Sequence, residues 1–225
     1  MDAKLDSRRP MGRIASLCLL TVVLASSGGC AGFTAQLIYW VKGGHTIDAE
    51  FDDLQDKRVA VVCVSSGSSY GPHSVCALLQ RSVATILTEK GDDIEIIHQD
   101  EIADWIDTNG WDEMDYREIG RGVDAERVVA IDIDGLRLHE GRTLYKGRVD
   151  LTVSVYDMEQ EGKVVFRRTI PEFTFPRNGA RHATEMSEAR FRILFVTMLA
   201  QHVAKYFCEY HLEEEFAPDA LLLSS

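Results

Sequence analysis

Residues 58–97 decide the fold, and they read RVAVVCVSSGSSYGPHSVCALLQRSVATILTEKGDDIEII. The stretch opens on an unbroken apolar run, Val59 to Val64, whose β-branched character is typical of a strand covered on both faces. After a Ser/Gly-rich loop, apolar residues recur at helical spacing from Ser74 to Lys90, with Ser74 as a cap and Gly91 at the end. A second strand is expected over Ile94–Ile97. A strand, a helix and a strand in this order predict a right-handed parallel crossover.

Two short helices are expected to follow this unit. The first spans Asp100–Asp107, with Asp100 as its cap and three apolar residues turned inward: Ile102, Trp105 and Ile106. The second spans Asp115–Gly120, with Gly122 after it. Acidic residues near its start suit the positive end of the helix dipole.

Three antiparallel strands are predicted next. The first, Arg127–His139, changes the parity of its apolar residues at Gly135, which indicates a bulge. The second, Arg148–Asp157, alternates apolar and polar residues, so one face belongs to the core and the other to solvent. The third, Lys163–Ile170, follows a tight turn and is expected to end at Pro171.

A long helix closes the predicted domain. Residues 173–182 carry turn signals, and a broad apolar stripe then runs through Thr184–Glu209. The predicted fold class is α+β, an α/β sandwich. Its mixed sheet has a parallel βαβ start, an antiparallel meander and the long C-terminal helix packed on one face.

The N-terminal stretch Arg13–Cys30, RIASLCLLTVVLASSGGC, has the form of an export signal. A basic flank leads into the apolar run Ile14–Ala25, and small residues precede Cys30. This order predicts a bacterial lipoprotein signal that is cleaved before Cys30, with Cys30 then carrying fatty acyl chains such as palmitate. The expected organisation is a signal peptide at 1–29, a tether at 30–57, one domain at 58–212 and a loose tail at 213–225.

Alternatives to that signal remain open. A transmembrane anchor needs about 20 apolar residues, which is more than this run offers. Plain secretory cleavage near Ala25 or Gly29 is the stronger rival, because Ser27 stands where lipoprotein signals prefer Leu. Met11 is a second candidate start, since a complete signal follows it. Ala31 and Gly32 follow the cysteine, with no Asp in the position that retains lipoproteins at the inner membrane, which favours the outer membrane facing the periplasm.

The charge balance argues against nucleic acid and anionic lipid as partners. The chain carries a formal net charge of −12. Without residues 1–29 it has 20 basic and 34 acidic residues, a net charge of −14. Such a surface repels phosphate backbones and anionic lipid, so nucleic acid is not an expected partner. The expected link to a membrane is the lipid on Cys30.

Three cysteines remain beyond the signal and Cys30, namely Cys63, Cys76 and Cys208. They allow at most one disulfide, and their spacing matches no metal motif. Cys63 lies in an apolar strand, where a free thiol acts as a small hydrophobe. Which of them pair, if any do, is left open.

The order of elements and the local text KRVAVVCV, DIEIIHQ, DEIADWI and GVDAERVVAIDIDG resemble a family of bacterial envelope lipoproteins. These are relatives of the curli-secretion lipoprotein and the penicillin-binding-protein activator lipoprotein, and the resemblance covers about Arg58–Tyr210. It implies a non-enzymatic protein that binds envelope partners or assembles. The sequence departs from the family in one respect. The curli-type pore crosses the outer membrane with long hairpins, and Leu144–Ile170 is the sole candidate for such a hairpin here. Because the core needs the apolar side of this segment, a pore is not expected.

The sequence contains several candidates for a catalytic, cofactor or metal site, but none of them predicts one. The loop Ser65–Ser69 could cradle a phosphate but matches no P-loop. Asp132 and Asp134 share a strand face, where solvated acids are more common than metal ligands. His202 falls near the stripe of the last helix and is expected to be a hydrogen-bonded core histidine. Three aromatic residues could form a partner-binding face or belong to the core: Trp105, Trp111 and Tyr116.

The sequence therefore predicts a lipid-anchored cell-envelope lipoprotein that binds another envelope component, with a protein as the expected partner. Two rival functions stay open. One is an envelope-tethered domain that binds a small ligand or nucleotide. The other is a subunit of a ring-like secretion assembly.

Overall fold

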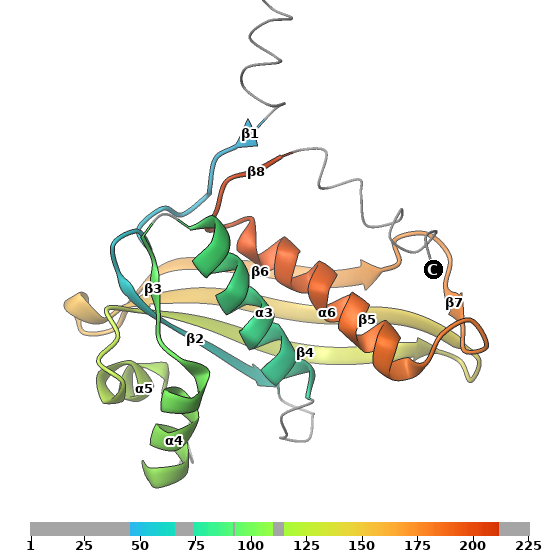
Figure 1. The fold of residues 1–225 in the computed structure, drawn as a ribbon, viewed down its shortest axis with the longest axis horizontal. Coiled ribbons are helices and arrows are strands. Elements are labelled where there is room, and N and C mark those ends of the chain that lie inside the picture. The colour runs from blue at the N-terminus through green and yellow to red at the C-terminus, as the bar shows by residue number, and fades with distance from the viewer. Residues whose placement is uncertain (1–45, 66–73, 92, 110–114, 212–225) are drawn as a thin grey trace, which may run out of the picture. The chain divides into compact units, whose positions relative to one another are not determined.

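The computed structural model describes residues 46–65, 74–91, 93–109 and 115–211 (Figure 1). The predicted signal and Cys30, most of the predicted tether, Ser66–Ser69, Trp111 and the tail 213–225 lie outside these ranges. In chain order the elements are β1 (Thr46–Ile47), β2 (Arg58–Ser65), α3 (Val75–Lys90), β3 (Glu95–Ile96), α4 (Gln99–Asn109), α5 (Tyr116–Gly122), β4 (Arg127–Glu140), β5 (Leu144–Asp157), the 3-10 turn η1 (Met158–Gln160), β6 (Lys163–Phe175), β7 (Arg181–His182), α6 (Glu188–Ala204) and β8 (Tyr210–His211).

The main sheet is mixed, as predicted. Its strands run in the order β3-β2-β4-β5-β6, and β7 pairs with β5. Strand β2 is parallel to both β3 and β4, whereas β4, β5 and β6 are antiparallel to one another. The short strands β1 and β8 form a separate two-stranded sheet. The parallel crossover and the meander expected from the sequence are both confirmed.

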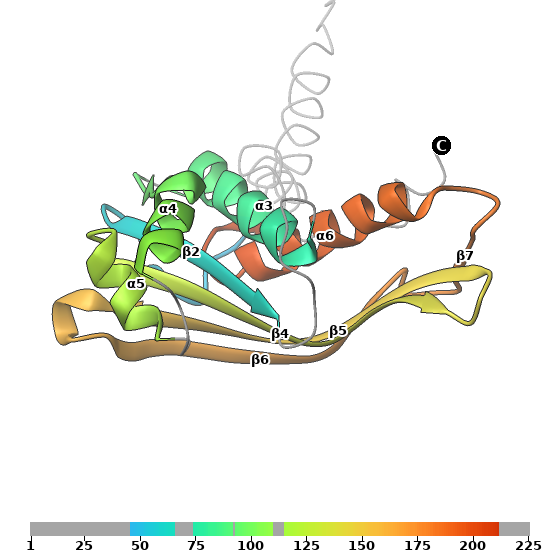
Figure 2. The same ribbon diagram turned by 90° about the horizontal axis from the view of Figure 1, so that it is seen from below.

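Helices α3 and α6 lie side by side over one face of the sheet (Figures 1 and 2). Their apolar stripes and the odd-numbered residues of β2 and β5 form one hydrophobic core. Phe191, Phe195 and Leu199 of α6 are fully buried in it. Helix α3 begins at its predicted cap, because the Ser74 hydroxyl accepts a hydrogen bond from the Ala77 backbone N–H at 3.2 Å.

Helices α4 and α5 cover the other face of β2 and β4. The alternate residues of β2, Ala60, Val62 and Val64, pack with Ile102 of α4 and Ile119 of α5 in a second core. Strand β2 is thus covered on both faces, which is why its sequence is an unbroken apolar run. Farther along the same face of β5 and β6, the Thr152 and Thr169 hydroxyls share an exposed hydrogen bond of 3.2 Å.

The predicted bulge in β4 is present. Gly135 has φ +59°, a left-handed conformation that glycine adopts without strain. The register between β4 and β5 shifts between Asp134 and Arg137, and again between Arg137 and His139. The change in apolar parity at Gly135 therefore marks a true irregularity of the ladder.

Strand β6 does not end at Pro171, which corrects the prediction; it continues to Phe175. Because β6 is the last strand of the sheet, proline is tolerated there. The register shifts between Val149 and Leu151, which leaves Pro171 and Glu172 in an irregularity. Glu172 has φ +50°, and its backbone N–H donates to Asp150 Oδ1 at 2.7 Å. The Asp150 carboxylate thus accepts the Glu172 N–H, which the strand ladder does not use.

Three predicted boundaries also shift. Helix α6 begins at Glu188 rather than Thr184, because Ser187 caps it by accepting from the Arg190 N–H at 3.3 Å, and it ends at Ala204. Helix α4 begins at Gln99, so Asp100 lies in its first turn and is not its cap. Strand β5 begins at Leu144, four residues before the predicted start, where it pairs with β4 and β7. Within the described residues, no helix is both long enough and apolar enough to span a bilayer.

The chain preceding β2 packs onto the domain. Leu54 is fully buried in the first core, and the Phe51 ring packs at a tilt against Phe166 of β6 with ring centroids 5.4 Å apart. The Phe51 N–H donates to the Tyr206 carbonyl at 2.9 Å. These contacts join residues 51–54 to β6 and to the end of α6.

A surface ion-pair network links this segment to the start of β4. Lys57 Nζ lies 3.2 Å from Glu126 and 3.0 Å from Glu159. The pKa of Glu126 is lowered by the Arg58 backbone N–H, which donates to its carboxylate, and then by Lys57. The pKa of Glu159 is lowered by Lys57 and then by Arg127. Both carboxylates are therefore more acidic in the folded chain than in the unfolded one.

This network predicts an acid-dependent loss of stability. A carboxylate with a lowered folded pKa stabilises the fold fully above its unfolded pKa, and this stabilisation is lost as pH falls through the folded value. We expect Glu126→Gln to have a lower melting temperature than the wild type at pH 7, and the difference to shrink steadily below about pH 4.5. Thermal unfolding from pH 7 to 3 measures this. Asp107→Asn, an exposed carboxylate on α4, is the control, and a Glu126→Gln difference that stayed constant with pH would contradict the assignment.

Candidate functional site

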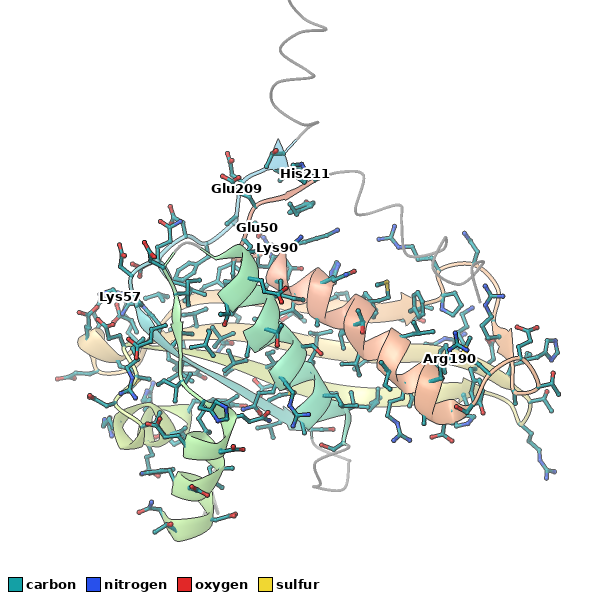
Figure 3. All side chains as sticks on the ribbon, in the orientation of Figure 1. Glu50, Lys57, Lys90, Arg190, Glu209 and His211 are labelled. Carbon is teal, nitrogen blue, oxygen red and sulfur yellow. The ribbon has the colours of Figure 1, made fainter. Side chains whose placement is uncertain are left out.

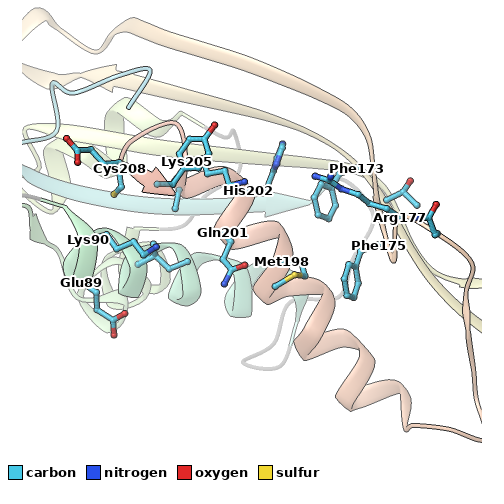
Figure 4. Close-up of a pocket in the computed structure, with 16 residues that line it drawn as sticks. Glu89, Lys90, Phe173, Phe175, Arg177, Met198, Gln201, His202, Lys205 and Cys208 are labelled. Carbon is cyan, nitrogen blue, oxygen red and sulfur yellow. The ribbon is translucent and has the colours of Figure 1, made fainter. Parts of the chain in front are cut away.

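A cavity of about 370 Å³ lies at the end of the α3–α6 pair, where both helices finish (Figure 4). We call it the α3–α6 cavity. Its walls are the last turn of α3, the second half of α6 with the chain after it, and the end of β6 with the turn that follows. These three segments are far apart in sequence. The size falls in the range of sites that hold a small molecule or a few side chains of a peptide.

The wall next to the sheet is apolar and firmly held. Phe173 and Phe175 project from the end of β6, and Met198 projects from α6 (Figure 4). Phe173 packs edge-on against Phe195 with ring centroids 5.8 Å apart, and Phe175 stacks on Phe191 at 6.3 Å. Because both rings contact fully buried aromatic side chains, this wall is fixed by the core and presents a preformed apolar surface.

Charged side chains surround the apolar wall. Three of the lining residues are cationic and two are acidic: Lys90, Arg177, Lys205, Glu89 and Glu209. Figure 3 shows Lys90 and Glu209 at the same end of the helix pair. Lys205 also sits over the Tyr210 ring at 4.6 Å from its centroid. The cavity carries a formal excess of positive charge in a chain whose net charge is −12, so it differs in sign from the rest of the molecule.

His202 lines the cavity from α6 and is half-buried. Its ring centroid lies 5.3 Å from that of Phe173 and 6.0 Å from that of Tyr206. The sequence placed this histidine near the core stripe, and the structure puts it at the boundary between the core and the cavity. From there its ring can contact an occupant of the cavity.

The two acids that are candidate metal ligands accept hydrogen bonds from the chain itself. Asp132 accepts a hydrogen bond from the Tyr116 hydroxyl, and Asp134 accepts one from the Gly135 N–H at 2.9 Å. Burial raises the pKa of Tyr116 far above its usual value, and the bond to Asp132 raises it further. Among the described residues no cluster of three or more His, Cys, Asp or Glu is arranged to hold a metal ion.

Of the two roles left open for the aromatic residues, packing is the one that the described part of the chain shows. Tyr116 is buried in the second core. Trp105 is half-buried, and its indole lies so close to Gly122 of α5 that a Cβ there would be 2.0 Å from Nε1. Because Gly122 has no side chain, the Trp105 indole of α4 can pack directly against α5, and the two helices can lie close together. Two of the three aromatic residues serve the contact between these helices and the sheet.

Comparison with known proteins gives structural resemblances. No family model matches the chain, and no curated protein matches it. A PelC dodecamer from Paraburkholderia phytofirmans has a TM-score of 0.40 at 14% identity, over 73% of this chain and 96% of that one. Lipoprotein GNA1162 from Neisseria meningitidis has a TM-score of 0.43 at 10% identity, over 65% and 97%. The C-terminal domain of LpoB from Salmonella enterica has a TM-score of 0.34 at 13% identity, over 60% and 93%.

The chain is similar to these three proteins in the arrangement of its elements, and one of them, GNA1162, is a lipoprotein. Sequence reasoning did not find the α3–α6 cavity, because it expected β6 to stop at Pro171 and so treated Phe173 and Phe175 as irregular chain. Their spacing of two was the available signal, since it is the period of a strand.

Proposed function

We propose that this protein is exported, lipidated on Cys30 and held at the outer membrane facing the periplasm. There it binds another envelope protein through the α3–α6 cavity without catalysing a reaction. The order of charge, apolar run and small residues in Arg13–Cys30 supports export and lipidation. The α3–α6 cavity is the observation that carries the binding role, because it combines a preformed apolar wall with a charged rim.

The chemistry of the cavity indicates which kinds of side chain can occupy it. The apolar wall favours an aliphatic or aromatic side chain, and burying one contributes about 1.5–3 kcal/mol. The three cations at the rim favour a carboxylate close to that side chain. We therefore expect the cavity to take a short acidic and apolar segment of a partner protein.

Lipidation is tested by labelling cells with radioactive palmitate. We expect the wild-type protein to incorporate label and to fractionate with the outer membrane, whereas Cys30→Ser loses the label because its hydroxyl cannot form the thioether to lipid. Cys208→Ser serves as the matched control and keeps the label. An unlabelled wild type, or equal label in Cys30→Ser, would contradict the lipid anchor.

The binding role is tested with a photocrosslinking residue at Gln201, which is exposed and lines the cavity. The same residue at Ile193, which is 58% exposed on α6 outside the cavity, is the control. We expect position 201 to capture one protein from whole cells and position 193 to capture none. Capture of a second copy of this chain favours the ring-like assembly. Equal capture from both positions would overturn the assignment to the cavity.

A blocked cavity should bind the captured partner more weakly. We expect Gln201→Trp to reduce affinity at least about tenfold, which is about 1.4 kcal/mol, because the indole occupies the mouth of the cavity. Ile193→Trp introduces the same residue on the same helix away from the cavity and should leave affinity within about twofold. Binding is measured by calorimetry with the purified partner. Equal losses in both variants would point to α6 as a whole and not to the cavity.

A further inference from the structure

Two cysteines meet where β2 ends and α3 begins. Cys63 lies near the end of β2, on the face that packs against α3, and Cys76 lies in the first turn of α3. Both are half-buried against the first core, and the Cys63 thiol is hydrogen-bonded to the Cys76 side chain. Neither is in a disulfide in this structure.

We propose that Cys63 and Cys76 form a disulfide in the exported protein. The inference rests on the proposed export, because disulfides persist in the bacterial envelope and are rare in the cytosol. Each thiol gives up one proton, the two sulfur atoms form one bond, and two electrons pass to the disulfide of an envelope thiol oxidase. That disulfide is reduced to two thiols in the exchange.

The third thiol of the domain is too far away to compete. Cys208 lines the α3–α6 cavity together with Lys90, the last residue of α3. Cys76 lies fourteen positions earlier on the same helix, which corresponds to about 21 Å along its axis. A disulfide needs Cα atoms within about 7 Å, so Cys76 and Cys208 cannot pair in the native fold.

The surroundings of Cys63 determine when the bond forms. Burial raises the pKa of the Cys63 thiol, and the neighbouring Cys76 raises it further. Because the thiolate is the reacting species, oxidation is slow once β2 and α3 have packed together. Oxidation is therefore faster in a partly packed chain, in which β2 and α3 already bring the two thiols together, than in the fully packed protein.

The disulfide would close a ring of fourteen residues that contains the connection from β2 to α3. Such a ring restricts the unfolded chain and so stabilises the fold. For a domain of this size we expect the melting temperature of the oxidised protein to exceed that of the reduced protein by about 8 °C. Cys63→Ser and Cys76→Ser should each abolish that difference, while Cys208→Ser should keep it.

Thiol trapping of the full-length protein tests the proposal. Cells are quenched in acid, free thiols are alkylated in denaturant, and peptides are mapped by mass spectrometry. We expect Cys208 to be alkylated and Cys63 and Cys76 to be recovered as one linked peptide pair. Alkylation of all three cysteines in protein recovered from the envelope would overturn the disulfide.

A second experiment, on purified protein, tests the disulfide independently of the proposed export. Purified full-length protein is unfolded and reduced, and then refolded with oxidised glutathione. We expect Cys63 and Cys76 to pair at least tenfold faster during refolding than in the reduced folded protein. If the protein stays uncleaved in the cytosol but pairs in this assay, the geometry holds and export fails. If it is exported but Cys63 and Cys76 do not pair in either arm, the disulfide fails and export holds.

Discussion

Gly147→Ala is expected to destabilise the protein by about 3 kcal/mol, measured as the free energy of unfolding in urea. Gly147 lies in β5 beneath α6, and a Cβ there would be 2.1 Å from Cδ2 and 2.3 Å from Cε2 of the Phe195 ring. The ring cannot move aside, because Phe195 is fully buried and packs against Phe173. The glycine is therefore what allows α6 to approach the sheet at this point.

Two further variants separate the clash from other effects of losing a glycine. Gly141→Ala, in the turn between β4 and β5, meets no atom within 4 Å but must adopt φ +70°, so it should cost about 1–2 kcal/mol. In a double-mutant cycle, Phe195→Leu should relieve Gly147→Ala by at least about 1 kcal/mol of coupling. Additive effects of the two substitutions would contradict a direct clash.

Arg127→Met should also cost about 3 kcal/mol, because it leaves a carboxylate buried without its cation. The side chains of Arg127 and Asp157 are only 4% and 3% exposed, and Arg127 Nη1 lies 2.8 Å from Asp157 Oδ1. The same guanidinium reaches Asp53 at 2.9 Å and Glu159 at 3.0 Å. This side chain therefore joins the chain before β2 to the β4 and β5 strands at the point where all three meet.

Arg58→Met is the matched control. Arg58 opens β2 as Arg127 opens β4, but its carboxylate partners, Glu95, Glu101 and Asp124, are largely exposed, so the loss should stay below about 1 kcal/mol. Adding Asp157→Asn to Arg127→Met should recover part of the loss, since the neutral amide still caps η1. Equal losses for Arg58→Met and Arg127→Met would show that burial does not decide the effect.

Much of the fold follows from local patterns in the sequence. The apolar run of β2 and the stripe of α3 are each complete within one element, so their type and order could be predicted. The boundaries that shifted depend on partners elsewhere in the chain. Pro171 continues β6 because β6 is an edge strand and because Asp150 of β5 accepts the N–H of Glu172. Neither fact is visible in the residues around the proline.

The α3–α6 cavity could not be predicted for the same reason. Its walls come from residues near 90, 175 and 205, and only the packing of α6 beside α3 brings them together. Asp132 is a similar case. Its spacing from Asp134 suggested a shared face, and the structure gives it a hydrogen bond from the Tyr116 hydroxyl, which comes from α5 on the same face of β4.

The irregularity at Pro171 and Glu172 in β6 also affects whether this sheet can pair with a strand of another chain. An edge strand of thirteen residues can recruit a further strand through its unused backbone amides, which is a common route to aggregation. Here two consecutive positions have no amide to offer: Pro171 carries no N–H, and the N–H of Glu172 is already bound by Asp150. A strand approaching this edge from a neighbouring molecule would find the row of donors interrupted, and the sheet is thereby guarded against growing past β6.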